Sequence, residues 1–80
     1  MEQRALAMMV RDQEHLARVE LRIAKFKDHI ARQREAIKSA IQRGYPTEED
    51  ESMLKVLEAS LRALDKHRQL ILDRLEAKRR

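Results

Sequence analysis

Cysteine is absent from this 80-residue chain, which excludes disulfide bonds, cysteine-ligated zinc and thiol catalysis. Tryptophan is also absent, and Phe26 and Tyr45 are the only aromatic residues, so a core built on rings is excluded. The longest apolar run, residues 5–10, is far shorter than the about 20 residues that a membrane-spanning helix needs. The first ten residues lack the organisation of a signal peptide, so we expect a soluble, cytoplasmic protein.

Charge and hydrophobicity are both abundant: 40% of the residues are charged and 42% are hydrophobic. This mixture of Ala, Leu, Glu, Lys and Arg is typical of long solvated helices and coiled coils. The apolar residues are periodic, so the high charge does not indicate disorder. The length allows one small domain, residues 1–80.

The single glycine and the single proline lie together, in residues 43–50. Gly44 has no Cβ and takes the left-handed conformation that closes a helix. Pro46 cannot continue a preceding helix, and Thr47 is a good N-cap for the acidic residues that follow it. We therefore predict a first helix over about 2–43, a turn over 44–46 and a second helix over about 47–80. Such a short connection makes the two helices antiparallel neighbours, an all-α hairpin.

Heptad spacing predicts a coiled-coil seam between these helices. In the first helix the seam positions are Met9, Leu16, Ile23, Ile30 and Ile37, and, three residues after each, Asp12, Val19, Phe26, Gln33 and Ala40. In the second helix they are Leu54, Leu57, Leu61, Leu64, Arg68, Ile71 and Leu75. Three seam positions are polar: Asp12, Gln33 and Arg68. Polar seam residues set register, orientation or oligomeric state, and a functional pocket built from them is the alternative interpretation.

Further apolar residues repeat outside the seam, and a single partner helix cannot cover them as well. One line is Val10, Ala17, Ala24 and Ala31, and the other is Val56, Ala63, Leu70 and Ala77. The first helix is also the longer, so its start should overhang the hairpin with Leu6, Met8, Met9 and Val10. Alanine is simply the best helix former, and scattered exposed apolar residues are normal, which is the alternative interpretation.

A lone two-helix hairpin of this size is marginal in stability, so we predict a homodimer that forms a four-helix bundle. The function that these surfaces predict is a non-enzymatic interaction or assembly module, whose partner is a second copy or another helical protein. The residues expected in that contact are Leu6, Met8, Met9, Val10, Ala17, Ala24, Val56, Ala63 and Leu70.

A basic ridge gives an alternative function, the binding of nucleic acid or another polyanion. The ridge comprises Arg4, Arg11, Arg18, Lys25 and Arg32, at seven-residue spacing. Acidic residues three positions after Arg11, Lys25 and Arg32 favour ordinary surface ion pairs instead. Aromatic residues for base stacking are not interleaved with the ridge.

Catalytic and metal-binding patterns are not apparent, so we expect neither an enzyme nor a cofactor or metal site. His15 and His29 lie about 21 Å apart along one helix and cannot share a metal ion. His67 is expected opposite Ala24. A less favoured alternative is a small all-helical enzyme similar to chorismate mutases, with a site built across the dimer. Its residues would be Arg22, His29, Gln33 and Arg68, and the similarity is one of length and charge.

Several residues of the last two thirds of the chain also form a recurring pattern. They are His29-Ile30, Gln33, Ile37, Gly44, Thr47, Leu54, Leu57-Glu58, Leu61, His67-Arg68, Ile71-Leu72 and Leu75. Over roughly residues 29–75 the chain resembles short, uncharacterised bacterial proteins, frequent in alpha-proteobacteria, that form helical hairpins. The resemblance implies a hairpin fold and a bacterial, cytoplasmic origin. It implies no activity.

Overall fold

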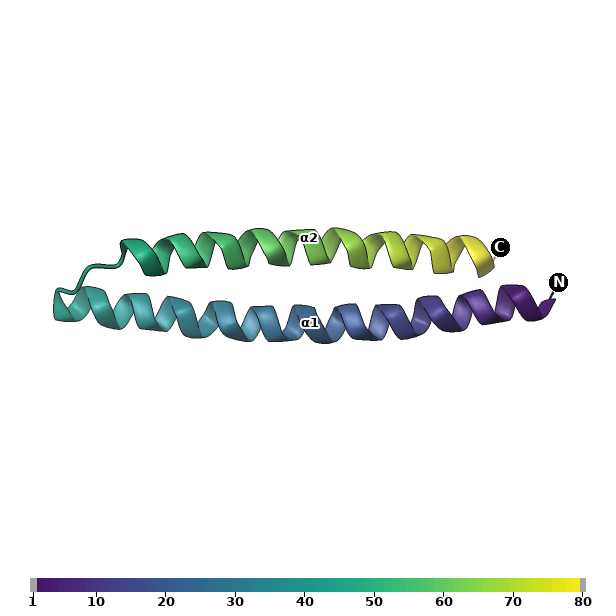
Figure 1. Ribbon diagram of the computed structural model, residues 1–80, viewed down its shortest axis with the longest axis horizontal. Coiled ribbons are helices and arrows are strands. Elements are labelled where there is room, and N and C mark those ends of the chain that lie inside the picture. The colour runs from purple at the N-terminus through teal and green to yellow at the C-terminus, as the bar shows by residue number, and fades with distance from the viewer. Residues whose placement is uncertain (1, 80) are drawn as a thin grey trace.

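The chain folds into two helices, α1 (Glu2–Arg43) and α2 (Glu48–Arg79), in a computed structural model that describes residues 2–79. The helices lie antiparallel, side by side along their length (Figure 1), in a rod of 64 × 15 × 14 Å. The predicted all-α hairpin is therefore confirmed. Within the described residues, neither helix is apolar enough over its length to cross a membrane.

The turn closes α1 with a Schellman motif. Gly44 has a φ of 75°, in the left-handed region where a side chain would be strained. The Gly44 N–H donates to the Ile41 carbonyl at 3.1 Å, and the Tyr45 N–H donates to the Ala40 carbonyl at 2.9 Å. These two bonds satisfy carbonyls that the helix end would otherwise leave unpaired.

The charges of α2 match its helix dipole at both ends. Its first turn carries Glu48, Glu49, Asp50 and Glu51, and its last turn carries Lys78 and Arg79. Carboxylates near the N-terminus and cations near the C-terminus of a helix are each favourable. The carbonyl of Thr47 accepts the first bond of the helix, from the Glu51 N–H at 2.8 Å.

The predicted seam is the buried core. The buried apolar residues are Val19, Ile23, Ile30, Ile37, Leu57, Leu64, Ile71 and Leu75, and all of them occupy seam positions. Ile71 is completely buried, whereas the other seam residues of the hairpin, such as Leu16, Phe26 and Leu61, are partly exposed. A two-helix rod buries one stripe per helix, so this core is a single layer.

The register of the two helices differs from the sequence-based expectation. If α1 ended and α2 began at the same height at the turn, His67 would lie opposite Ala24. Instead, His67 contacts His15. The expectation was wrong because α1 runs on past the start of α2 at the turn end (Figure 1). The extended residues after Gly44 carry the chain back along α1 before α2 begins. Every residue of α2 therefore lies closer to the N-terminus of α1 than a flush turn would allow.

Candidate interaction surfaces

A charged cluster lies at the open end of the hairpin, near the start of α1 and the end of α2. Asp12 is 9% exposed, and its carboxylate accepts a bond from Lys78 Nζ at 2.5 Å and an ion pair from Arg74 at 3.3 Å. The bond from Lys78, with the charges of Arg74 and Lys78, lowers the pKa of Asp12 below its ordinary value, although partial burial opposes this. Asp12 lies opposite the end of α2, and its expected role in setting the register stays a prediction.

Two histidines meet across the seam next to this cluster. The Nε2 atoms of His15 and His67 lie 3.1 Å apart, and the two rings are inclined at 64° with centroids 4.8 Å apart. At this distance one ring donates an N–H and the other accepts with a nitrogen lone pair. Both side chains are half-buried. The sequence did not reveal this pair, because it depends on the register of the helices and not on spacing along either one.

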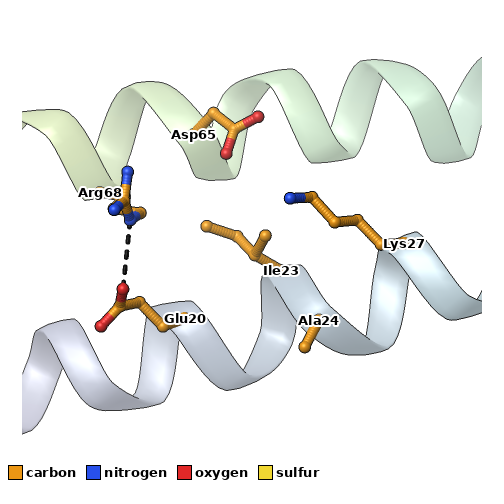
Figure 2. A pocket seen from close by; sticks show the side chains of 6 residues that line it. All are labelled: Glu20, Ile23, Ala24, Lys27, Asp65 and Arg68. Atoms are coloured by element: carbon orange, nitrogen blue, oxygen red, sulfur yellow. Dashed lines mark hydrogen bonds and ion pairs between the residues drawn. The ribbon is translucent and has the colours of Figure 1, made fainter.

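A shallow hollow of about 350 Å³ lies on the other edge of the seam (Figure 2). Arg68 and Glu20 form an ion pair at 3.3 Å at one end of it, Lys27 lies at the other end, and Asp65 lies between them on α2. Ala24 and Ile23 line the side of the hollow that α1 forms. The two acidic and two basic groups balance in charge, so the hollow selects neither anions nor cations. Arg68, expected as a polar seam residue, is thus paired and partly exposed.

Gln33, the third polar seam residue, lies near the turn. Its side-chain amide donates to the carbonyl and to the carboxylate of Asp50, both at 3.3 Å. The next residue of α1, Arg34, pairs with Glu58 at 3.1 Å on the surface. Gln33 therefore links α1 to the first turn of α2.

The four residues considered for a chorismate-mutase-like site are not brought together within one chain. Gln33 bonds to Asp50 and Arg68 bonds to Glu20, and positions 20 and 33 of α1 are about 20 Å apart along the helix. Arg22 and His29 are exposed. An enzyme site from these residues would depend on a second copy.

The two predicted apolar lines lie on opposite sides of the hairpin. Ala24 lines the hollow together with Glu20. Glu20 immediately follows the seam residue Val19, so the hollow and Ala24 lie at one edge of the seam. His15 immediately precedes the seam residue Leu16, so His15 and the pair with His67 flank the opposite edge. The α2 line lies on the same side as His67. Ala63 is four residues before His67 and Leu70 is three residues after it, and residues at these spacings are neighbours on a helix surface. The residues expected to form one contact surface therefore divide between two sides.

The individual residues of that expected surface fall as follows. Leu6, Val10, Ala17 and Ala24 belong to the side of the hollow, and Met8, Val56, Ala63 and Leu70 to the side of the histidine pair. Met9 is half-buried at the end of the seam. At the open end α1 continues beyond the last described residue of α2 (Figure 1). The overhang is shorter than expected, because Met8 lies beside Arg74 and Lys78 of α2 and the half-buried Met9 belongs to the seam.

The basic ridge runs along the same side as the α2 apolar line. The ridge lies on the His15 side of α1. Arg11 is four residues before His15 and Arg18 is three residues after it, so both are neighbours of His15 on the helix surface. Every ridge residue is exposed, namely Arg4, Arg11, Arg18, Lys25 and Arg32. Arg32 forms an ion pair with Asp28 at 3.1 Å, within its own helix and not with the acidic residue three positions later. This side of the hairpin thus joins a basic surface on α1 to an apolar one on α2.

The described residues contain no group of three or more His, Asp or Glu side chains that could together hold a metal ion. Comparisons of the chain with family models, with curated proteins and with solved structures found no match. The resemblance to bacterial helical-hairpin proteins therefore stays a prediction. The structure shows the class of the protein, an all-α antiparallel two-helix hairpin.

Proposed function

We propose that this protein is a non-enzymatic assembly module that associates with a second copy of itself through the outer face of α2. One observation carries the proposal: apolar side chains at seven-residue spacing along one side of α2 are exposed to solvent. Val56 and Leu70, at either end of Ala63, are 60% and 62% exposed, as much as the turn residue Tyr45. Removing apolar surface of this kind from water is favourable by about 25 cal/mol per Å².

The spacing of the line suits a two-fold axis. If two α2 helices pack antiparallel with Ala63 on the axis, Val56 of each copy lies opposite Leu70 of the other. The small side chain of Ala63 lets the helices approach closely at the centre, and the larger side chains close the contact on either side. Such a contact is isologous, so it closes at two copies.

Charge complementarity favours the same arrangement. The first turn of α2 is acidic from Glu48 to Glu51, and its last turn is basic at Lys78 and Arg79. An antiparallel pair of α2 helices places the acidic end of each copy beside the basic end of the other. A parallel pair would place like charges together, which costs affinity.

This contact uses part of the surface expected from the sequence. Val56, Ala63 and Leu70 lie within it, whereas Ala17 and Ala24 lie on the other side of the hairpin and stay open. The assembly still contains four helices, with the two α2 helices at its centre. The homodimer, a further helical partner, the cytoplasmic location and the bacterial origin all stay predictions.

The test is the absolute mass in solution, measured by light scattering on a sizing column over a concentration series. We expect a dimer whose dissociation constant rises at least about 30-fold in Leu70→Glu, because an acidic group would be buried in the contact. Leu21→Glu is the matched control, since Leu21 is 57% exposed and faces outward on α1. A monomeric wild-type chain would overturn the proposal, and so would equal weakening by both variants.

A second candidate function is polyanion binding by the basic ridge, favoured by the exposure of all five ridge residues. Heparin and duplex DNA are suitable probes, with binding followed from low to moderate salt. Replacing Arg11 and Arg18 by Gln should weaken binding and reduce its salt dependence. The control is the double variant Lys55→Gln/Arg62→Gln on α2, which removes the same number of positive charges outside the ridge. Absence of binding at low salt would remove this candidate.

A further inference from the structure

We propose that His15 and His67 form a binding site for a divalent transition-metal ion of the Cu²⁺, Ni²⁺ or Zn²⁺ class, which would link α1 to α2. The two Nε2 atoms are 3.1 Å apart. Metal–imidazole bonds are about 2.0–2.1 Å long, so two nitrogens in neighbouring positions of a square or tetrahedral site lie about 2.9–3.4 Å apart. The helices already hold the two nitrogens at that separation, with no shift of the backbone.

The protonation state of the pair is compatible with a metal ligand. One Nε2–H at present points to the lone pair of the other Nε2. When each ring carries its proton on Nδ1, both Nε2 atoms offer a lone pair to the ion. The ion would lie to one side of the line that joins the two nitrogens, about 2 Å from each, and the rings would turn about their side-chain bonds so that both lone pairs point to it. Water would complete its coordination, because both side chains are only half-buried.

The surroundings select the kind of ion. Arg11 and Arg18 on α1, and Lys66 and Arg74 on α2, lie within about one or two turns of the histidines. Of the two carboxylates just before His15 in the chain, Asp12 is engaged by Arg74 and Lys78, and Glu14 is exposed. Hard cations such as Mg²⁺ and Ca²⁺ need several oxygen ligands and are disfavoured by this positive setting. Cu²⁺, Ni²⁺ and Zn²⁺ bind imidazole strongly enough to be held by two nitrogens.

Metal binding at this place would couple to folding. His15 and His67 are 52 positions apart in the chain and meet only when the hairpin is formed. An ion that binds the folded chain and not the unfolded one raises the stability in proportion to the logarithm of its concentration. The inference does not depend on the proposed dimer, because both ligands come from one chain.

The experiment is thermal unfolding of the untagged chain, followed by circular dichroism at pH 7.5, with and without the chloride salts of Cu²⁺, Ni²⁺ and Zn²⁺. At an ion concentration ten times the dissociation constant, we expect Tm to rise by about 5–10 °C. Mg²⁺ should give no rise. His15→Gln and His67→Gln should each abolish the rise. His29→Gln should retain it, because His29 is an exposed histidine at the same heptad position as His15.

A second measurement on the wild-type chain keeps the inference testable if the variants fail to fold. Paramagnetic Cu²⁺ at substoichiometric amounts should broaden the ring C–H resonances of His15 and His67 and leave those of His29 sharp. Equal broadening of all three histidines would overturn the inference. So would a metal-induced rise in Tm that survives in the His15→Gln/His67→Gln double variant.

Discussion

The two halves of the hairpin are held together in different ways. In the open half, toward the chain ends, Val19, Ile23, Leu64, Ile71 and Leu75 form one continuous buried cluster. In the turn half, Ile30, Ile37 and Leu57 are buried but lie outside that cluster. The continuous part of the buried core is thus found in the half that is farther from the turn.

The position of the turn explains this difference. Near Gly44 the covalent connection already keeps α1 and α2 close, so little contact energy is needed to hold them there. Far from the turn, bringing the helices together costs conformational entropy that grows with the length of the closed loop. The open half therefore depends on its own packing, and it also holds the buried carboxylate of Asp12 and the pair of His15 with His67.

The largest effect is expected from removing packing in the open half. Ile71→Ala should lower the free energy of unfolding by about 2–5 kcal/mol, because Ile71 is completely buried and leaves a cavity. Leu57→Ala should cost less, because Leu57 is in the turn half and outside the buried cluster. Urea unfolding at one fixed protein concentration measures both. Equal costs would show that the two halves do not differ in packing.

The next largest effect is expected at the turn itself. Gly44→Ala should cost about 1–2 kcal/mol, because the φ of 75° places a Cβ in the left-handed region. Space is not the cause, since nothing lies within 4 Å of the added Cβ. Gly44→Asn should cost less, because Asn tolerates this conformation better than Ala does. If Asn and Ala destabilise equally in urea, the strain at Gly44 is not conformational.

A smaller, pH-dependent effect is expected at the open end. The pKa of Asp12 is lowered in the folded chain, so the ionised carboxylate stabilises the fold. This stabilisation is fully present above the unfolded pKa of about 3.9, and it is lost as the pH falls through the lower pKa of the folded chain. The difference in Tm between the wild type and Asp12→Asn should therefore be largest near pH 6 and shrink toward pH 3. Glu35→Gln, at an exposed position, is the control and should show no such narrowing. A difference that stays constant with pH would contradict the role of the Asp12 carboxylate.

Much of the fold was predictable because its signals are local. Gly44, Pro46 and the heptad spacing lie in the sequence itself, and they led to the antiparallel hairpin and its seam. The buried residues all fall at predicted seam positions, since a helix of 3.6 residues per turn has one face that can meet a single partner.

The surfaces were less predictable because they depend on register. The path of the chain after Gly44 decides how far α2 is set back along α1, and spacing within either helix does not report it. The contact of His15 with His67 was missed for this reason, and His67 was wrongly placed opposite Ala24. The split of the apolar residues between two sides was missed because each helix was considered separately.

The smallest effect is expected from the polar seam residue of the turn half. Gln33→Leu should raise Tm by a few degrees, because an apolar side chain gains more from the half-buried seam position than Gln33 does from its two 3.3 Å contacts with Asp50. Asp50 is partly exposed and would turn to water. The matched change in the open half, Asp12→Leu, should lower Tm, because it leaves the cations of Arg74 and Lys78 beside the seam without their partner. Light scattering on both variants would show whether either polar residue also fixes the number of copies. A fall in Tm with Gln33→Leu would mean that the link from Gln33 to Asp50 holds the start of α2 in place, and that the turn half also depends on specific polar contacts.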